Sequence, residues 1–465
     1  RIRSCFKNIG LDFPVKRVLV NLSPADIKKK GSSFDLGIFL GILSNIGKIR
    51  NIENFKNYLI LGEISLNGEV KSVKGAINAT ILAKEKGIRG VIIPYENYDE
   101  ACLISGVEIV PVSKIEEAVS FLNGKISLDE LHKSMKEKMD LKKNGKSKRN
   151  KEEKNEVDFS DVKGQFLAKR AMEIAAAGGH NIFLMGDPGS GKSMLAKRFV
   201  TILPEMSEKE IIETTKIYSI SGMLSPDKPV ITERPFRAPH HSATQTALVG
   251  GAIRAGEITL ALNGVFFMDE LGEFGTRTLE TLRQPLEDGS VTISRANLIV
   301  NYPVNNIMIA ASNPTPGGFF QDDPQCKDSL RDIKNYQKKF SGPLLDRIDL
   351  YVEMRRLKKE EIFSECESES SETVKERVIK AREIQKKRFN EDFLNGKMSR
   401  KQISEYCKID SETKKVLERA IDELKLSVRA YDKILKVSRT IADLEGSKNI
   451  KTEHLLEALN YRKKY

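Results

Sequence analysis

Hydrophobic positions in the first third of the chain follow two periodicities in turn. Short runs of β-branched residues, which predict strands, alternate with stretches in which apolar residues recur at helical spacing. The runs are Val18–Val20, Tyr58–Leu61 and Gly90–Ile93, and the helical stretches include Asp35–Leu43 and Gly75–Lys86. This order predicts an α/β domain.

The middle of the chain contains three apolar runs with the composition of buried parallel strands. They are Ile182–Met185, Val265–Met268 and Ile307–Ala311, and each is followed by a polar or glycine-rich turn. Such strands predict a nucleotide-binding sheet. Beyond residue 373, apolar positions recur at helical spacing over 374–389 and over 428–444, which predicts a small helical bundle.

Two charged stretches separate these parts. Residues 141–155, LKKNGKSKRNKEEKN, carry seven Lys or Arg and a single apolar residue, whereas residues 363–373, FSECESESSET, carry four Glu and no base. Neither stretch can bury a core, so both are expected to connect packed parts. The predicted organisation is an N-terminal domain over 1–124, a charged linker over 125–156, a nucleotide-binding core over 157–362 and a helical domain over 374–465.

Composition narrows the class of protein. The chain is 40% hydrophobic and 31% charged and has no apolar run of ~18 residues, so we expect a soluble protein with buried cores. Its five cysteines are scattered without a C-x-x-C pair, which favours a reducing, cytoplasmic compartment over a disulfide framework. No further metal ligands accompany His240 and His241, for which we expect a structural or interface role. The 77 basic and 65 acidic side chains leave a net charge of +12, which suits a phosphate-rich partner such as nucleic acid without establishing one.

A phosphate-binding loop stands between the first of the three apolar runs and the helix-like stretch MLAKRFV. It matches the pattern G-x-x-x-x-G-K-[ST] in the strand–loop–helix context that this pattern requires. Lys192 is expected to meet the β and γ oxygens of ATP, and Ser193 to ligate Mg²⁺, while backbone N–H groups surround the phosphates. The loop residues are Gly186, Asp187, Pro188, Gly189, Ser190, Gly191, Lys192 and Ser193.

Polar residues also follow the other two predicted strands. Asp269 is expected to hold the magnesium ion, and Glu270 to orient or deprotonate the attacking water, which distinguishes hydrolysis from mere nucleotide binding. Without the phosphate loop, these two acids would be interpreted as surface residues. Asn313 follows the third strand and is a candidate for sensing the γ-phosphate, although Asn-Pro alone usually marks a turn.

Six motifs in order, the phosphate loop among them, resemble those of the magnesium-chelatase-like AAA+ ATPases of the ComM/YifB type. The resemblance covers nearly the whole chain and includes SRTIADL at 438–444. It implies a P-loop AAA+ domain with a parallel sheet, a C-terminal helical lid, ATP and Mg²⁺ as cofactors, and a hexameric DNA motor; one member is regarded as a branch-migration helicase. The other motifs are RPFRAPHHSAT (234–244), GEITLALNGVFFMDE (256–270), LRQPLEDGSVTISRA (282–296), ASNPTPGG (311–318) and SGPLLDRIDL (341–350).

Further residues acquire roles through this resemblance. Arg347 matches the arginine finger that reaches from one subunit into the ATP site of its neighbour; by itself it would be interpreted as half of a surface ion pair with a nearby aspartate. Asn313 matches the first sensor. Arg429 resembles the second sensor on the helical lid, with Arg439 as the alternative.

Two inserts in the core are candidates for contact with DNA. The first contains the glycine-rich stretch 250–256, with Arg254 as its basic residue. The second, 289–300, has two β-rich arms around a basic tip and predicts a hairpin. It resembles the pre-sensor hairpin of the minichromosome maintenance helicases, in which the residue at the place of Arg295 contacts DNA. Such contacts would be to the backbone and sensitive to salt.

Residues 1–124 resemble the proteolytic domain of Lon proteases, which use a Ser nucleophile activated by a Lys. Alignment with the Lon pattern places Ile77 where the lysine belongs, so Ser33, near the nucleophile position, would lack its base. Lys74 lies three residues away and is a poor substitute. The resemblance predicts an inactive fold used in assembly or DNA binding, which normally begins earlier than Arg1, so a strand is expected to be missing.

Together these features predict an ATP-driven, magnesium-dependent homo-hexameric motor that moves along DNA and promotes branch migration. Recombination proteins are candidate partners, and no membrane is expected. Three alternatives stay open: a magnesium-chelatase motor subunit for porphyrin metallation, an ATP-dependent Lon-like protease, and an ATP-gated scaffold. The Lon-like domain and the Arg295 hairpin argue against the first, and Ile77 argues against the second.

Overall fold

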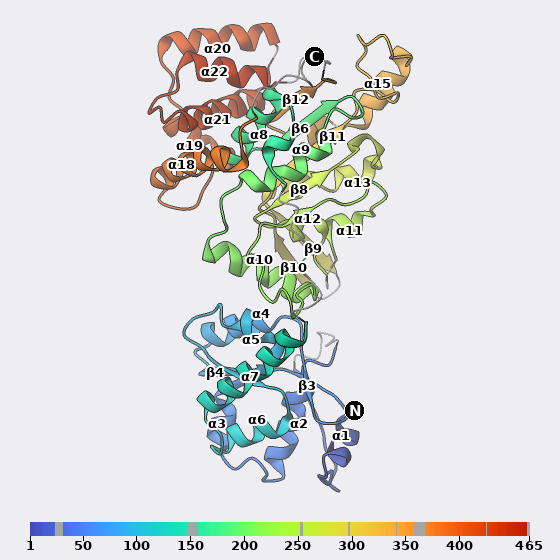
Figure 1. The fold of residues 1–465 in the computed structure, drawn as a ribbon, viewed down its shortest axis with the longest axis vertical. Coiled ribbons are helices and arrows are strands. Elements are labelled where there is room, and N and C mark those ends of the chain that lie inside the picture. The colour runs from blue at the N-terminus through green and yellow to red at the C-terminus, as the bar shows by residue number, and fades with distance from the viewer. Residues whose placement is uncertain are drawn as a thin grey trace. The chain divides into compact units, whose positions relative to one another are not determined.

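The computed structural model describes residues 1–23, 31–146, 157–251, 254–295, 298–340, 342–357, 368–424 and 426–462 (Figure 1). Packing divides the chain into two compact units. The first comprises 1–154, 207–232 and 294–299, and the second comprises 155–206, 233–293 and 300–465. No helix in the described ranges is both long enough and apolar enough to cross a membrane.

The first unit is built on a parallel sheet in the order β1-β4-β5, with β4 in the centre. All five residues of β4, GVIIP, are buried, as expected for a parallel strand covered on both faces. Its elements are α1 (Ile2–Asn8), α2 (Asp35–Asn45), α3 (Ile52–Lys56), β1 (Tyr58–Ile60), β2 (Glu63–Ile64), β3 (Val70–Lys71), α4 (Ala76–Glu85), β4 (Gly90–Pro94), η1 (Tyr95–Asn97), α5 (Tyr98–Ala101), β5 (Glu108–Val112), α6 (Ile115–Leu122), α7 (Leu128–Lys146) and α10 (Glu208–Ser221).

The structure departs from the predicted N-terminal domain in two places. Val18–Val20 form no strand, and their side chains are exposed, because an apolar run becomes a strand only where another strand pairs with it. Packed structure also continues past residue 124: α7 lies against β5 and buries Leu131 and Met135, one helical turn apart. The charge-rich composition that predicted a linker from 125 onward therefore includes a packed helix.

A segment predicted to belong to the nucleotide-binding core packs with the first unit instead. Helix α10 begins at a capping box formed by Ser207 and Glu210 and ends at Gly222, whose φ is 67°. It lies against α4, where the Ser219 hydroxyl accepts a hydrogen bond of 2.9 Å from the backbone N–H of Gly75. The resemblance of this unit to Lon proteases stays a prediction.

The second unit contains a five-stranded sheet in the order β12-β6-β11-β8-β7, and every pairing in it is parallel. The three apolar runs of the sequence form β6, β11 and β8, its central strands, as predicted. The elements of this part are η2 (Phe159–Asp161), α8 (Phe166–Gly178), β6 (Ile182–Gly186), α9 (Lys192–Arg198), η3 (Phe199–Ile202), β7 (Phe236–Arg237), α11 (Gln245–Val249), α12 (Glu257–Leu260), β8 (Val265–Met268), η4 (Leu271–Glu273), α13 (Thr276–Glu280), α14 (Arg283–Asp288), β9 (Ser290–Arg295), β10 (Leu298–Pro303), β11 (Ile307–Ser312), α15 (Leu330–Lys339), α16 (Gly342–Leu345) and β12 (Leu350–Met354). The last residues of β9 and the first residues of β10 fall within 294–299 and so belong to the first unit.

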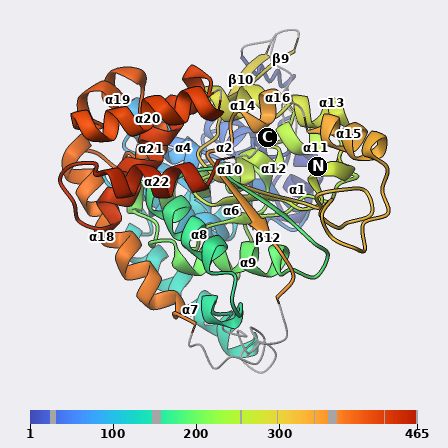
Figure 2. The ribbon, with the colours of Figure 1, turned by 90° about the horizontal axis from the view of Figure 1, so that it is seen from above.

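The C-terminal helices gather on one side of this sheet in both views (Figures 1 and 2). They share one core with it, because α8 packs against β6 and β12 and also against α18 and α21. Small side chains such as those of Ala175, Ala176 and Ala177 allow this close approach. The predicted α/β class with a parallel sheet and a C-terminal helical part is confirmed. The helices are α18 (Ser371–Phe389), α19 (Arg400–Tyr406), α20 (Ser411–Leu424), α21 (Val428–Leu444) and α22 (Thr452–Asn460), with the short η5 (Asn395–Lys397) after α18.

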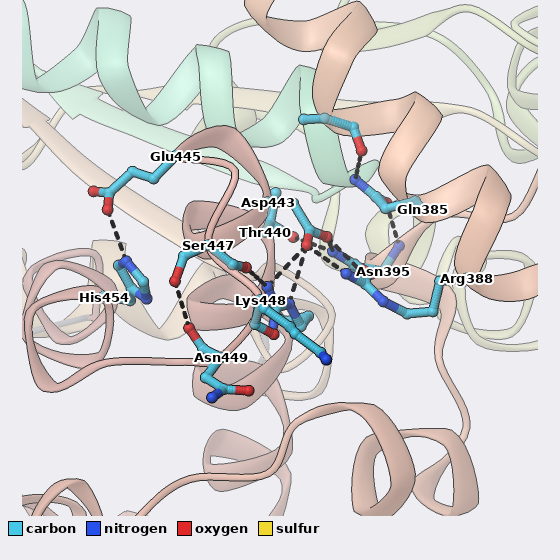
Figure 3. Close-up of polar contacts among 12 residues, drawn as sticks. Gln385, Arg388, Asn395, Thr440, Asp443, Glu445, Ser447, Lys448, Asn449 and His454 are labelled. Carbon is cyan, nitrogen blue, oxygen red and sulfur yellow. Dashed lines mark hydrogen bonds and ion pairs between the residues drawn. The ribbon is translucent and has the colours of Figure 1, made fainter.

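A buried carboxylate holds these helices together (Figure 3). Asp443, whose side chain is fully buried, accepts hydrogen bonds from Arg388 at 2.8 Å, from Asn395 at 2.8 Å and from Arg439 at 3.1 Å. Asn395 also donates to the Thr440 hydroxyl at 3.2 Å. Because a buried charge is tolerated only when it is paired and hydrogen-bonded, these contacts fix α18, η5 and α21 relative to one another.

Removing this carboxylate is expected to destabilise the second unit. Asp443→Ala leaves the guanidinium groups of Arg388 and Arg439 without their partner, and breaking a buried pair in this way costs about 3–5 kcal/mol of unfolding free energy. Urea unfolding followed by circular dichroism measures the loss. Asp392→Asn, which removes the partner of Lys386 in an exposed pair, is the control and should cost at most about 1 kcal/mol. Equal losses in the two variants would contradict this account.

Candidate functional site

The phosphate loop connects the end of β6 to the start of α9. Gly189 and Gly191 have φ angles of 79° and 93°, which other residues rarely adopt, and open space surrounds the position of an added Cβ at each. At Gly186 an added Cβ would lie 2.2 Å from the carbonyl oxygen of Met354 on β12. The loop is therefore bare where a ligand would approach and tightly packed where it joins the sheet.

Lys192 is buried in this loop, and its side chain bends back over it. The ammonium group donates to the carbonyl oxygens of Gly186 at 2.6 Å and Asp187 at 2.9 Å, and to Oδ1 of Asn313 at 3.2 Å. Burial lowers its pKa from the ordinary value, while the carboxylate of Asp269 raises it. The structure thus brings Lys192 and Asn313 together, as the order of the strands predicts.

The two predicted magnesium ligands are also adjacent. The Ser193 hydroxyl donates to Oδ2 of Asp269 at 2.6 Å, and Oδ1 of Asp269 accepts from the backbone N–H of Glu270 at 3.0 Å. A hydroxyl and a carboxylate suit Mg²⁺, which takes its remaining ligands from phosphate oxygens and water. Within the described ranges, no three His, Cys, Asp or Glu side chains gather into another metal site.

Two buried polar atoms of the loop support the fit of a polar ligand. Among the residues that the structure describes, Oδ1 of Asp187 and Oγ of Ser190 have no hydrogen-bond partner. Buried polar atoms are normally paired, so unpaired ones at a bare glycine-rich loop indicate a place for phosphate or its bound water. The residues present therefore fit a magnesium nucleotide.

Glu270 has a partner that the sequence analysis missed. Its backbone adopts a left-handed conformation with φ 50°, and its side chain is 59% exposed. Nδ1 of His241 lies 3.2 Å from its carboxylate, and the ring of His240 lies 4.0 Å from that of His241. The paired histidines, expected to be structural, thus reach the proposed water-orienting residue through His241.

Gln165 and Arg356 also contact the phosphate loop, although neither belongs to a motif of the sequence. The Gln165 amide donates to the carbonyl oxygens of Ser190 at 3.3 Å and Arg355 at 2.8 Å. The backbone N–H of Arg356 donates to the Asp187 carboxylate, and its guanidinium donates to the Pro188 carbonyl, both at 3.3 Å. One precedes α8 and the other follows β12, so only the fold brings them to the loop.

Arg347 and Arg429 lie together, but not at the phosphate loop. The guanidinium of Arg347 forms an ion pair with the carboxylate of Glu287, and Arg429 lies 3.8 Å from the same carboxylate. Both arginines line a cavity of about 530 Å³ whose lining includes no residue of the loop. The alternative second sensor, Arg439, is buried among structural partners: it pairs with Asp443 and donates to backbone carbonyls of the lid.

The two predicted DNA contacts are placed only in part. Arg254 is exposed, and its carbonyl accepts a hydrogen bond of 2.8 Å from the backbone N–H of Gly251. The predicted hairpin is present as β9 and β10, and Arg295 is the last residue of β9. Its side chain lies outside the described residues, so its contact with DNA stays a prediction.

Three family descriptions match successive parts of the chain. The family described as "Magnesium chelatase, subunit ChlI" matches residues 158–362, its C-terminal part matches 368–462, and "Subunit ChlI of Mg-chelatase" matches 1–97. The chain is 42% identical over 466 residues to "Competence protein ComM" of Haemophilus influenzae, with 99% of this chain and 88% of that protein covered. It is 39% identical over 466 residues to "Uncharacterized protein YifB" of Escherichia coli, with the same coverage. Similarity extends to "DNA replication licensing factor mcm6" of Dictyostelium discoideum, at 24% identity over 281 residues, 60% of this chain and 27% of that protein.

The pairing of Ser193 with Asp269 predicts a specific magnesium dependence. Ser193→Ala and Asp269→Asn should each raise, by about tenfold or more, the Mg²⁺ concentration needed to bind a fluorescent ATP analogue, because each removes an oxygen ligand. Asp392→Asn, which removes an exposed carboxylate paired with Lys386 and no ligand of the nucleotide site, is the control. If Asp392→Asn moves the magnesium requirement as far as Ser193→Ala does, the assignment is wrong.

Proposed function

Because the chain belongs to the ComM/YifB family of magnesium-chelatase-like AAA+ proteins, we propose that it hydrolyses ATP at sites shared between neighbouring copies and uses the energy to move along DNA. The observation that carries the proposal is the meeting of the phosphate loop, Asp269, Glu270 and Asn313 at the carboxyl ends of β6, β8 and β11. ATP and Mg²⁺ are the proposed cofactors.

Each residue of this cluster has a task that its geometry supports. The ammonium of Lys192 exchanges its bonds to loop carbonyls for phosphate oxygens, and its neighbour Asn313 is placed to contact the γ-phosphate. Ser193 and Asp269 hold Mg²⁺, which neutralises charge on the phosphates. Glu270, next to Asp269, accepts a hydrogen bond from the attacking water and orients it.

A neighbouring copy would complete the site. Arg347 and Arg429 line a cavity apart from the phosphate loop, so a single chain does not offer them to its own nucleotide. A guanidinium supplied from a neighbour can stabilise the charge that develops on the γ-phosphoryl group, an effect worth about 10³–10⁵ in rate in related NTPases. A closed ring gives every loop such a neighbour, and a hexamer is the ring that the family resemblance implies.

The candidate DNA elements are Arg254 and the β9–β10 hairpin. The net charge of +12 and the similarity to a protein named as a DNA replication licensing factor support a DNA substrate. The N-terminal part, with buried Ile77 at the place of the Lon lysine, is proposed to serve assembly or DNA binding rather than proteolysis. Remodelling of branched recombination intermediates is the proposed outcome.

A second candidate is the motor subunit of a magnesium chelatase, which the description of the matching family favours. A chelatase subunit has no need of DNA, whereas a DNA motor is expected to hydrolyse ATP faster when DNA is bound. The response of ATP turnover to branched DNA separates the two functions.

Shared sites predict complementation between inactive copies. Lys192→Ala removes the ammonium group of the phosphate loop, and Arg347→Ala removes the guanidinium group of the proposed finger. Each variant alone should therefore lose most ATP turnover. In an equimolar mixture roughly a quarter of the interfaces join an intact loop to an intact finger, and turnover should partly return. The double variant Lys192→Ala/Arg347→Ala, mixed with either single variant, is the control. Absence of any recovery, or a chain that sediments as a monomer at saturating nucleotide, would falsify the shared site.

The hairpin predicts a salt-sensitive response to DNA. Branched DNA should stimulate ATP turnover of the wild-type chain, and Arg295→Ala or Arg254→Ala should reduce the stimulation severalfold while basal turnover is retained. Arg400→Ala, which removes an exposed lid arginine, is the matched control and should respond as the wild type does. A wild-type chain that hydrolyses ATP but ignores DNA at low salt would refute the DNA motor and leave the ATPase in place.

A further inference from the structure

Glu287 links the two arginines to the hairpin. It lies in the last turn of α14, which ends at Asp288; Gly289, with φ 64°, follows, and β9 begins at the next residue. Its carboxylate pairs with Arg347 and lies 3.8 Å from Arg429, and the guanidinium of Arg347 holds the pKa of this carboxyl below its usual range. Helix α14 therefore contains the residue that pairs with Arg347 and leads directly into β9, the first strand of the hairpin.

The backbone around the finger is held independently of Glu287. The side-chain amide of Asn181 donates to the carbonyl of Arg347 at 3.1 Å, and the ammonium of Lys433 on α21 donates to the carbonyl of Ile348 at 2.7 Å. The Arg347 side chain itself is 10% exposed, whereas that of Glu287 is 52% exposed. In this ion pair the Glu287 side chain is therefore the more exposed member. It lies on α14, whereas Arg347 lies on a different segment whose backbone is held by Asn181 and Lys433.

The base of the hairpin is continuous with this contact. The backbone N–H of Val304, just after β10, donates to the carbonyl of Gly289 at 2.7 Å, which ties the two arms at their base. Gly289 and Val304 also line the cavity that contains Glu287, Arg347 and Arg429. The end of α14, the start of β9 and the residue after β10 are therefore joined at this cavity.

We propose that Glu287 is a positioning residue that holds Arg347 and Arg429 until the triphosphate of the neighbouring subunit replaces it, so that its release carries the nucleotide state of that neighbour to the β9–β10 hairpin. This inference rests on the proposed function. The exchange is chemically matched, because a guanidinium fork binds carboxylate and phosphate oxygens in the same way and the triphosphate carries more charge. A half-exposed ion pair biases an equilibrium by at most about fivefold, so the neighbour's phosphate can displace it.

Glu287→Gln tests this arrangement, with Asp288→Asn as the matched control on the next residue of the same cavity. Removing the carboxylate should weaken the hold on both arginines, so assembly with a non-hydrolysable ATP analogue should reach its midpoint at a two- to fivefold lower protein concentration in sedimentation. Basal ATP turnover should rise by up to about fivefold, and stimulation by branched DNA should fall close to none. Asp288→Asn should match the wild type in all three measurements.

The outcomes separate this inference from the function on which it rests. If Glu287→Gln assembles and responds to DNA as the wild type does, or if it loses basal turnover as Arg347→Ala does, the inference is overturned while the ATPase stands. Glu287→Asp should restore at least half of the stimulation by DNA; failure to do so also overturns it. A wild-type chain without ATP turnover refutes the proposed function itself, and the assembly midpoint still reports on Glu287. Thermal unfolding of the variants should be unchanged, because the side chain is half exposed.

Discussion

Backbone hydrogen bonds between β6, β11 and β8 bring together the residues that we propose bind and hydrolyse ATP at the phosphate loop. Ser312 of β11 pairs with Met185, and Ala310 of β11 pairs with Met268, so all three strands end within a residue or two of the same edge. The phosphate loop leaves from β6 at that edge, while Asp269 and Asn313 follow the neighbouring strands. Side chains from three segments that are far apart in the sequence therefore meet within hydrogen-bond distance: Lys192 with Asn313, and Ser193 with Asp269. A slip of one residue in either pairing would turn each side chain to the opposite face of the sheet.

One face of this sheet packs against a hydrophobic core that it shares with the C-terminal helices. Helix α8, rich in alanine, packs between the strands and α18 and α21, so the helices near the C-terminus do not form a separate bundle. The buried Asp443 reinforces this core by pairing with Arg388 and Arg439. A buried carboxylate is tolerated only while its hydrogen bonds are kept, so these contacts restrict how α18 and α21 can move relative to each other. On α21, Lys433 donates to the carbonyl of Ile348, and Arg429 lines the cavity that contains Arg347.

Two kinds of electrostatic contact thus serve different purposes in the second unit. Pairs that are fully buried, such as Arg439 with Asp443, hold the architecture. Pairs that keep one member exposed, such as Arg347 with Glu287 and His241 with Glu270, involve the groups proposed to act on ATP. Exposed pairs are weak because water screens them, so a bound nucleotide can rearrange them at little cost. The described contacts therefore combine buried pairs that hold the architecture with exposed pairs at the groups proposed to act on ATP.

Local pattern in the sequence determined the strands β6, β8 and β11, the phosphate loop and the helical C-terminal part, because hydrophobic period and glycine spacing act within a few residues. It also identified Asn313 as a candidate, which lies beside Lys192, whereas the role of Arg347 came from the family resemblance and stays a prediction. Contacts between distant segments were decided by the tertiary structure alone. Val18–Val20 form no strand and α10 packs with the first unit. His241 contacts Glu270, Gln165 contacts the phosphate loop, and Glu287 pairs with Arg347 in a separate cavity. The physical reason is that the energies of strand pairing and side-chain packing depend on both of the surfaces that meet. The residues of one segment do not specify which other segment will pack against it.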